Sequence, residues 1–575
     1  MIKKCQLFLI APIISLVLLN CVNNTKADNA KNEKVNNTIT STEEGHDDLS
    51  SNYKSLDSIQ KQLHDIYPKL LQSTVSIECS YSDPATGVLI SEDGYVLTAK
   101  HVLELSLTGK KLEVCLSDGT SYMADILGQD FSLDYALLKI NEKKIFPYSK
   151  LGNISNLSKD EALLMIGYSN YPPMGRLGFY KGINNCGFLQ ATCIMQPGDS
   201  GGPIFDLEGN VIGLCSHISE RFDQNFYAPV DNIRTNIERL KKGEIISTDS
   251  WLNCMSSEVK DPPPYKEEKP FVIKGGKNML KKVFSNHNSK YRKSIIRIES
   301  IKEGIKRKTY ASIVNSDGIA VAKSSEVTND ITACFSHDNS NVTCRVVARN
   351  KENDIALIKI DNIKDLTPIS LDFNGRIKHG DFLTTVTHEE NSSKYSGIVS
   401  LEYVSITNLG AGYLGAFFKT DENLTVQQLA EDGAAKRGGL KKGDKVIRFN
   451  EKPVSNIEDL SALVQKTEPY ELVTISILRE GKELSKNFEI GQLPIYGYEK
   501  EHTADYTKVN FRNANFPVVF MHDMPIHVED CGTPVINFNE EVVGINIARK
   551  DRASSLVIPT YQIKDIISEM LDNTK

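Results

Sequence analysis

The stretch Gln196-Pro-Gly-Asp-Ser-Gly-Gly-Pro203 places Ser200 among three glycines. Glycine lets the backbone turn sharply and adopt conformations that other residues avoid, so several N–H groups can point at one spot. A serine in such a turn, within a chain rich in short strands, has few purely structural uses. Ser200 is therefore a candidate nucleophile, which requires a neighbouring base and a carboxylate that orients the base.

Two upstream segments offer these partners. The stretch Gly87-Val-Leu-Ile-Ser-Glu-Asp-Gly-Tyr-Val-Leu-Thr-Ala-Lys-His101 places a histidine after a strand and a tight turn, and Leu133-Asp-Tyr-Ala-Leu-Leu-Lys139 places Asp134 at the start of an apolar strand. Taken singly, such a histidine is more often structural and such an aspartate is more often a turn or cap residue. Together with Ser200 they predict a catalytic triad of His101, Asp134 and Ser200.

The region around these segments has the pattern of an all-β barrel or sandwich. Its runs are rich in β-branched and aromatic residues, with Asp-Gly turns at Asp93-Gly94 and Asp118-Gly119, and helical periodicity is largely absent. The predicted strands cover 74–79, 85–90, 95–99, 111–116 and 135–140.

The three segments that carry His101, Asp134 and Ser200 resemble the chymotrypsin/trypsin fold in its bacterial HtrA-type (DegP-like) branch, over residues 63–245. That resemblance implies two six-stranded β-barrels with the triad in the cleft between them. It also implies that the backbone N–H groups of Gly198 and Ser200 form the oxyanion hole. Asp199 departs from the branch, in which most members carry Asn before the serine.

The same resemblance places the primary specificity pocket at Ile194 and Cys215. Both residues are uncharged. We therefore expect an apolar side chain before the scissile bond.

The chain then repeats itself with substitutions. Residues 311–325 align without gaps on 87–101, and 353–359 align on 133–139, so that Asp354 is kept while Ser325 stands at the histidine position. Near the C-terminus, 529–534 align on 198–203 and place Cys531 at the nucleophile position. Without an imidazole, nothing lowers the pKa of that thiol or protonates a leaving amine. The segments 286–409 and 493–575 are thus predicted to form a degenerate protease-like domain, with residual thiol catalysis as the alternative.

Residues 410–492 interrupt this second copy. The loop Gly412-Tyr413-Leu414-Gly415 and the turn Gly-Leu-Lys-Lys-Gly-Asp444 resemble a PDZ domain of the HtrA type. The resemblance implies that an extended peptide adds as a strand and that its terminal carboxylate is held by N–H groups of the loop 412–415. Ordinary turn chemistry is the alternative reading of these glycines.

The N-terminus predicts export. A basic start, Lys3-Lys4, precedes the apolar run Leu7 to Leu19, which has the length of a signal-peptide core, so residues 1–20 are predicted to be removed. The sequence Leu18-Leu19-Asn20-Cys21 resembles a bacterial lipobox and predicts a lipid on Cys21; an incidental cysteine after a plain signal peptide is the alternative.

Two polar segments follow the pattern of connectors. Residues 21–62 are predicted to be a disordered tether, because their first part has almost no large apolar residues. Residues 246–285 contain Asp261-Pro-Pro-Pro-Tyr265 and are predicted to be an extended linker. Cys334 and Cys344 flank a polar turn between two strand-like runs, so they either pair across a hairpin or remain separate thiols.

Composition narrows the function classes. A net charge of −7 and a pI near 6.0 give no electrostatic reason to bind nucleic acid. No metal-ligand cluster or phosphate-binding glycine loop appears, so no cofactor is expected. Two hypotheses remain: a lipid-anchored endopeptidase of the bacterial cell envelope, periplasmic or on the outer surface, that acts on polypeptides; or an adhesin or scaffold in which proteolysis is minor. The sequence leaves homo-oligomerisation open.

Overall fold

The computed structural model describes residues 46–250 and 290–572, apart from gaps at 79–83, 106–110, 170–171, 219–223, 303–304, 362–365, 387–395, 407–411, 419–423, 431–432, 468–470, 493–508 and 511. The chain divides into two compact units, Met1–His46 and Asp47–Lys575, and almost all described residues belong to the second. The predicted signal peptide, Cys21 and most of the predicted linker 246–285 lie outside the described residues.

The first described element is the helix α1, His46–Ser73. It begins inside the segment 21–62 that the sequence predicted to be a disordered tether, and this part of the prediction is wrong. The reason is a helical apolar stripe, because Leu56, Leu63, Tyr67 and Leu70 recur on one face and are all buried. The helix packs into the core that includes Leu164 and Phe205 of the first protease-like domain.

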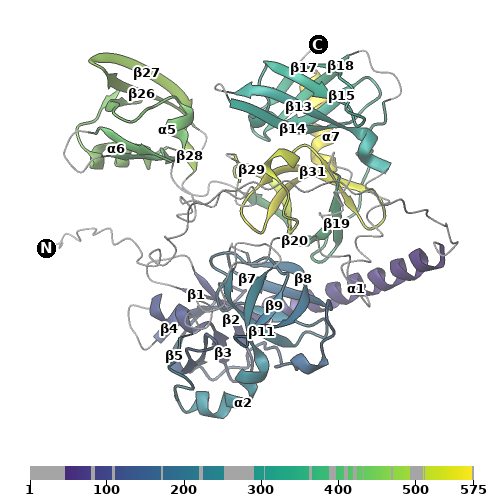
Figure 1. The fold of residues 1–575 in the computed structure, drawn as a ribbon, viewed down its shortest axis with the longest axis vertical. Coiled ribbons are helices and arrows are strands. Elements are labelled where there is room, and N and C mark those ends of the chain that lie inside the picture. Colours follow the sequence, from purple (N-terminus) through teal and green to yellow (C-terminus); the bar gives the residue numbers. More distant parts are fainter. Residues whose placement is uncertain are drawn as a thin grey trace, which may run out of the picture. The chain divides into compact units, whose positions relative to one another are not determined.

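That domain consists of two closed six-stranded barrels, as predicted (Figure 1). The first barrel has the order β1-β2-β3-β6-β5-β4 and the second β10-β11-β12-β9-β8-β7. The strands are β1 Thr74–Glu78, β2 Ala85–Leu89, β3 Tyr95–Thr98, β4 Lys111–Cys115, β5 Ser121–Asp130, β6 Tyr135–Ile140, β7 Ala162–Gly167, β8 Met174–Ile183, β9 Leu189–Ala191, β10 Pro203–Phe205, β11 Val211–Ile218 and β12 Asn225–Pro229. The helix α2, Val230–Lys241, follows β12.

The second protease-like domain repeats this plan with one difference. Its C-terminal half is a closed barrel, β19-β20-β29-β32-β31-β30, but its N-terminal half is a six-stranded sheet with the order β16-β13-β14-β15-β18-β17 and with β16 and β17 at the edges. The strands are β13 Ile295–Lys302, β14 Ile305–Ile313, β15 Ile319–Lys323, β16 Ile331–Phe335, β17 Thr343–Asn350, β18 Ile355–Asp361, β19 Phe382–Thr385, β20 Ser396–Ile406, β29 Phe516–His522, β30 Pro534–Asn537, β31 Val542–Arg549 and β32 Ser555–Pro559. The chain then forms the helix α7, Thr560–Asp572.

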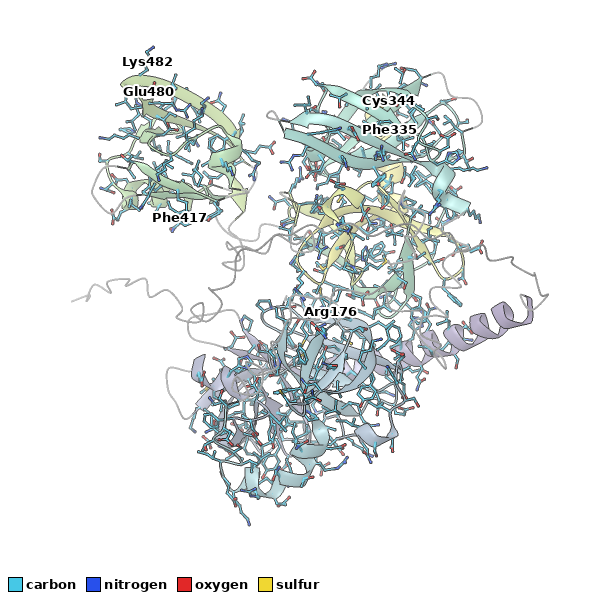
Figure 2. The ribbon with its side chains drawn as sticks, viewed as in Figure 1. Arg176, Phe335, Cys344, Phe417, Glu480 and Lys482 are labelled. Atoms are coloured by element: carbon cyan, nitrogen blue, oxygen red, sulfur yellow. A yellow bond between two sulfur atoms is a disulfide. The ribbon has the colours of Figure 1, made fainter. Side chains whose placement is uncertain are left out.

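A disulfide joins the two edges of that sheet. Cys334 on β16 and Cys344 on β17 are bonded, which confirms the pairing across a hairpin (Figure 2 labels Cys344 and its neighbour Phe335). In the first barrel the corresponding strands β4 and β5 are joined by a full hydrogen-bonded ladder from Lys111 to Cys115. The covalent link thus stands where the second copy has lost most of a strand pairing.

The inserted domain lies between β20 and β29 in the chain and appears in green in Figure 1. Its elements are β21 Gly412–Tyr413, β22 Ala416–Phe418, β23 Val426–Leu429, α5 Ala434–Arg437, β24 Lys445–Phe449, β25 Lys452–Pro453, α6 Ile457–Val464, β26 Leu472–Arg479, β27 Lys482–Glu489 and β28 Gly491–Gln492. It has its own core, in which Leu460 and Val464 of α6 pack with Val473 and Ile475 of β26. Asn456 caps α6, because its side chain accepts a hydrogen bond from the Asp459 amide at 2.7 Å.

Candidate active site

The structure brings the three predicted triad residues together. His101 Nε2 lies 2.8 Å from Ser200 Oγ, and His101 Nδ1 lies 2.8 Å from Asp134 Oδ2. Both distances are those of hydrogen bonds. His101 comes from the short 3₁₀ helix after β3, Asp134 from the turn before β6, and Ser200 from the turn before β10. This arrangement permits the imidazole to take the serine proton while the carboxylate holds its other nitrogen.

Asp134 is fixed by its own backbone and by several donors. It is fully buried and adopts a left-handed backbone conformation with φ 57°, which is uncommon for a residue other than glycine. Its Oδ1 accepts the His101 amide at 3.0 Å, and its Oδ2 also accepts the hydroxyl of Ser216 at 2.5 Å. Sequence reasoning missed Ser216, although it directly follows Cys215, which the same reasoning assigned to the specificity pocket.

The environment of His101 favours the charged imidazole. Burial lowers the pKa of His101, but the hydrogen bond that its imidazole donates to Asp134 and the negative charge of Asp134 outweigh this effect and raise the pKa above the ordinary 6.5. A second histidine nearby behaves in the opposite way: His217 stacks on Phe226, and burial lowers its pKa to about 4. His217 therefore stays neutral over the pH range in which His101 titrates.

The turn that carries Ser200 is held by Thr86. The Thr86 hydroxyl donates to the Gly198 carbonyl at 2.7 Å, and the Thr86 amide donates to the Ser200 carbonyl at 2.9 Å. Gly198 has φ 94° within a turn closed by the Asp199 amide on the Gln196 carbonyl. Gly201 cannot be replaced, since a Cβ there would lie 2.2 Å from Thr98 Oγ1.

The predicted oxyanion donors belong to this same turn. Among the described residues, no protein acceptor is bonded to the amide of Gly198 or of Ser200. Two such amides next to the nucleophile can stabilise the oxygen on which negative charge develops during acyl transfer.

Asp199, the residue before the nucleophile, forms a buried ion pair that the sequence did not predict. Arg176 Nη1 on β8 donates to Asp199 Oδ2, and the two side chains are 0% and 1% exposed. Arg176 Nη2 also donates to Ser169 Oγ at 2.5 Å. Burial raises the pKa of the Asp199 carboxyl, and the Arg176 guanidinium acts against that rise. The sequence signal was weak: one arginine in the otherwise apolar strand Met-Gly-Arg-Leu-Gly-Phe.

The two predicted pocket residues are both buried next to the nucleophile turn. Ile194 is 8% exposed and Cys215 is 1% exposed. The backbone of Cys215 is paired with that turn, because its amide donates to Gly202 and its carbonyl accepts from Gly201. Burial raises the pKa of the Cys215 thiol well above its ordinary value, so the thiol is neutral. The apolar preference at this pocket stays a prediction.

The second protease-like domain reproduces the backbone of this site. The Tyr310 amide donates to the Cys531 carbonyl as Thr86 does to Ser200, and the Gly532 amide donates to Asn546 as Gly201 does to Cys215. Asp354 shares the left-handed conformation of Asp134, with φ 56°, and its Oδ1 accepts the Ser325 amide. The gapless sequence alignment is therefore matched by equivalent hydrogen bonds.

The side chains of this second site differ from a catalytic set. The ammonium of Lys323 is buried and donates to Asp354 Oδ2 at 2.6 Å, and the Ser325 hydroxyl donates to the same oxygen at 2.8 Å. Cys531 is fully buried, its thiol donates to Asn510 Oδ1, and burial raises its pKa to about 12. The thiol is thus kept protonated, and the carboxylate that would orient a base is paired with lysine.

The histidines near Cys531 in sequence do not serve it as a base. His522 is fully buried and its Nε2 lies 2.8 Å from Asn546 Oδ1. Burial lowers the pKa of His522 to about 4. The His527 amide donates to Asp530 Oδ2, which repeats the bond between Gln196 and Asp199 in the first domain.

The predicted carboxylate loop 412–415 precedes β22 in the inserted domain. The Leu414 carbonyl accepts the Ala435 amide and the Gly415 carbonyl accepts the Ala430 amide, so the loop carbonyls are held by neighbouring backbone. The amide of Gly412 is bonded to Thr467 and is not available to a ligand. Within the part of the chain that the structure describes, β22 pairs only with β23, which leaves its second edge open.

The turn Gly-Leu-Lys-Lys-Gly-Asp444, which the sequence singled out, is held by hydrogen bonds to Asp444. Asp444 accepts two hydrogen bonds from Arg479, at 2.6 and 2.7 Å, and one from the Lys441 amide. Burial of Asp444 raises the pKa of its carboxyl, but these bonds outweigh the effect and hold the pKa below its usual value. The bidentate pair fixes the turn between α5 and β24.

Comparison with known proteins agrees with this fold. The family model of the trypsin-like peptidase domain matches residues 85–214, and that of the PDZ domain matches residues 412–490. The fold and the site thus define a trypsin-like peptidase domain. With the PDZ domain added, the chain is similar to HtrA/DegP-like proteases.

The match between this chain and each of two curated relatives covers only part of that relative. A probable periplasmic serine endoprotease DegP-like from Pseudomonas savastanoi pv. phaseolicola is 33% identical over 190 residues, which cover 30% of this chain and 38% of the relative. A protein of the same description from Bartonella henselae is 29% identical over 239 residues, covering 37% and 46%. The crystal structure of Deg5 shares 23% identity, with 32% of this chain and 97% of that one covered and a TM-score of 0.29, too low to support an argument. The chain spans less than half the length of both curated relatives.

Among the described residues, no helix is long and apolar enough to cross a membrane. No group of three or more His, Cys, Asp or Glu side chains in the same residues is placed to hold a metal ion.

Proposed function

We propose that this protein is a serine endopeptidase whose catalytic centre is His101, Asp134 and Ser200 in the first protease-like domain. Ser200 Oγ attacks the scissile carbonyl, His101 takes its proton and later gives it to the leaving amine, and Asp134 holds the imidazole in place. The amides of Gly198 and Ser200 bind the oxyanion. The observation that carries this proposal is the continuous chain of hydrogen bonds from Asp134 through His101 to Ser200.

The proposed substrates are polypeptides, as for the relatives that the chain resembles. The matching relatives are described as periplasmic serine endoproteases, which supports an exported enzyme that cleaves polypeptides in the cell envelope. The buried, uncharged residues Ile194 and Cys215 support cleavage after an apolar side chain. The lipid on Cys21 is part of the proposal and rests on the sequence.

The other two domains are proposed to recruit or regulate. The open edge of β22 beside the loop 412–415 suits addition of a peptide strand with a free C-terminus. The second protease-like domain keeps the fold of the site but has Lys323 on its carboxylate and a protonated Cys531, so it binds or scaffolds instead of cleaving.

The test is hydrolysis of unfolded casein by the full-length chain, with labelling by a fluorophosphonate probe. The wild type should be labelled by the probe and should cleave casein. Ser200→Ala should lose the labelling, and its rate should be at most roughly 10³–10⁴-fold above that of the uncatalysed reaction, as for a site without its triad. His101→Ala should match Ser200→Ala, because residues that act as one unit are not additive.

Cys531→Ala is the matched control and should cleave at the wild-type rate. Turnover by Ser200→Ala that a thiol alkylator abolishes would instead make the second domain the working enzyme. A wild type that neither labels nor cleaves would favour the scaffold or adhesin.

A further inference from the structure

The residue Asp199 forms hydrogen bonds with both ends of the turn that carries the nucleophile. Its Oδ2 accepts the amide of Gln196 at 2.8 Å, at the start of the turn, while its backbone carbonyl accepts the amide of Gly202, at the end. On its other side, Asp199 Oδ1 fills the space next to Gly167, where a Cβ would lie 2.1 Å away. The aspartate thus braces both ends of the segment that contains Gly198 and Ser200.

Such a brace is stable only if its charge is compensated. Asp199 is 1% exposed, and a buried carboxylate without a partner is strongly unfavourable. Arg176 of β8, which Figure 2 labels, supplies the compensation, since its guanidinium donates to Asp199 Oδ2 and is itself fully buried. Ser169 holds the other end of the guanidinium through Nη2.

We propose that Arg176 is a positioning residue for catalysis: by neutralising Asp199 it holds the turn 196–200 in the form in which the amides of Gly198 and Ser200 face the substrate carbonyl. The inference rests on the proposed peptidase function and extends it to a residue on a different strand, 23 positions before Asp199. The counter-charge is supplied by a side chain of the same domain.

The mechanism predicts which kinetic constant changes. The turn contacts the substrate where charge develops, so its displacement weakens binding of the transition state more than binding of the ground state. Loss of Arg176 should therefore lower kcat and leave KM nearly unchanged. A defect in general folding would instead reduce the amount of active enzyme, which titration of the active sites with the fluorophosphonate measures.

The experiment compares R176M, the double variant R176M/D199N and the control K181M, all in the full-length chain, by active-site titration and by kcat and KM for a peptide substrate. R176M should lose about 10²–10³-fold in kcat, the cost of one oxyanion donor. The double variant removes both charges while keeping the shapes similar, so it should recover to within about tenfold of the wild type. K181M breaks a second ion pair of β8, that of Lys181 with Asp160, and should turn over normally.

The outcomes separate the two proposals. A wild type without turnover contradicts the peptidase function itself. An active wild type with equally active R176M overturns only the role of Arg176, and so does a double variant as impaired as R176M. If R176M does not fold, the double variant decides: near-wild-type kcat supports charge compensation, and a loss of 10²-fold or more overturns it.

Discussion

At the residue scale, a single carboxylate sets the chemistry of each protease-like domain. In the first domain Asp134 accepts from His101 and Ser216, and the base is ready to serve Ser200. In the second, Asp354 accepts from Lys323 and Ser325, and no base faces Cys531 among the described residues. The two carboxylates share a backbone conformation, so the difference lies in the side chains that reach them.

The raised pKa of His101 predicts a pH dependence. His101 must be neutral to act as a base, so kcat/KM should fall as the pH drops through an apparent pKa above 6.5. Asp134→Asn removes the charge that raises this pKa, and it should shift the acid limb to lower pH while lowering kcat by about 10⁴-fold. The measurement is a pH–rate profile of both proteins. An acid limb near pH 4 in the wild type would contradict the assignment and point to a group such as His217.

At the scale of elements, the helix α1 packs on the first protease-like domain. Residues 46–62 of α1 fall within the segment that the sequence predicts to be a tether, because the first part of that segment is polar. Its apolar residues recur with helical spacing, and Gln62 bonds the Leu207 carbonyl while Ser73 bonds Ser149 of the first domain. The helix is therefore part of the fold of the first protease-like domain.

A substitution in α1 tests this. Leu63→Ala removes a fully buried side chain and should lower the free energy of unfolding by about 2–5 kcal/mol. Lys61→Ala removes an exposed side chain two residues away and should change it by less than about 0.5 kcal/mol. Denaturant unfolding of the full-length chain measures both. Equal free energies of unfolding for the two variants would contradict the packing of α1 and favour a tether.

The PDZ domain should discriminate peptide C-termini. Peptides with a free carboxylate and an apolar last residue should bind at least about tenfold more tightly than their amidated forms, because a charge-assisted hydrogen bond is lost on amidation. Fluorescence anisotropy provides the affinities.

A matched glycine pair tests the loop. Gly415→Ala, at φ 67° and with its Cβ 2.7 Å from the Gly433 backbone, should abolish the preference. Gly443→Ala, which is also left-handed but meets nothing within 4 Å, should keep it. Equal affinity for acid and amide in the wild type would leave the domain as a spacer.

At the scale of the whole molecule, two protease-like domains share a chain, one with a complete candidate triad and one without the histidine. The second copy keeps the backbone hydrogen bonds of the active site and has lost the imidazole. A disulfide from Cys334 to Cys344 is consistent with an exported protein.

The predicted anchor is testable on the whole protein. Wild-type chain should incorporate radiolabelled palmitate and fractionate with membranes, because an acyl chain on Cys21 partitions into lipid. Cys21→Ser should lose the label and appear in the soluble fraction. Retention of the Cys21→Ser protein in the detergent phase would rule out the lipobox.

Local patterns of strand, turn and glycine were sufficient to predict the protease fold, the PDZ insertion and the candidate triad His101, Asp134 and Ser200. The sequence also indicates the degenerate copy, since the gapless repeat aligns Ser325 with His101 and Cys531 with Ser200.

The contacts of Ser216, Arg176 and Lys323, and the packing of α1, became known from the folded chain. Arg176 meets Asp199 across 23 residues, and Ser216 meets Asp134 across 82. Their functions depend on which buried charge they reach, and burial is a property of packing between distant segments, which no local pattern encodes.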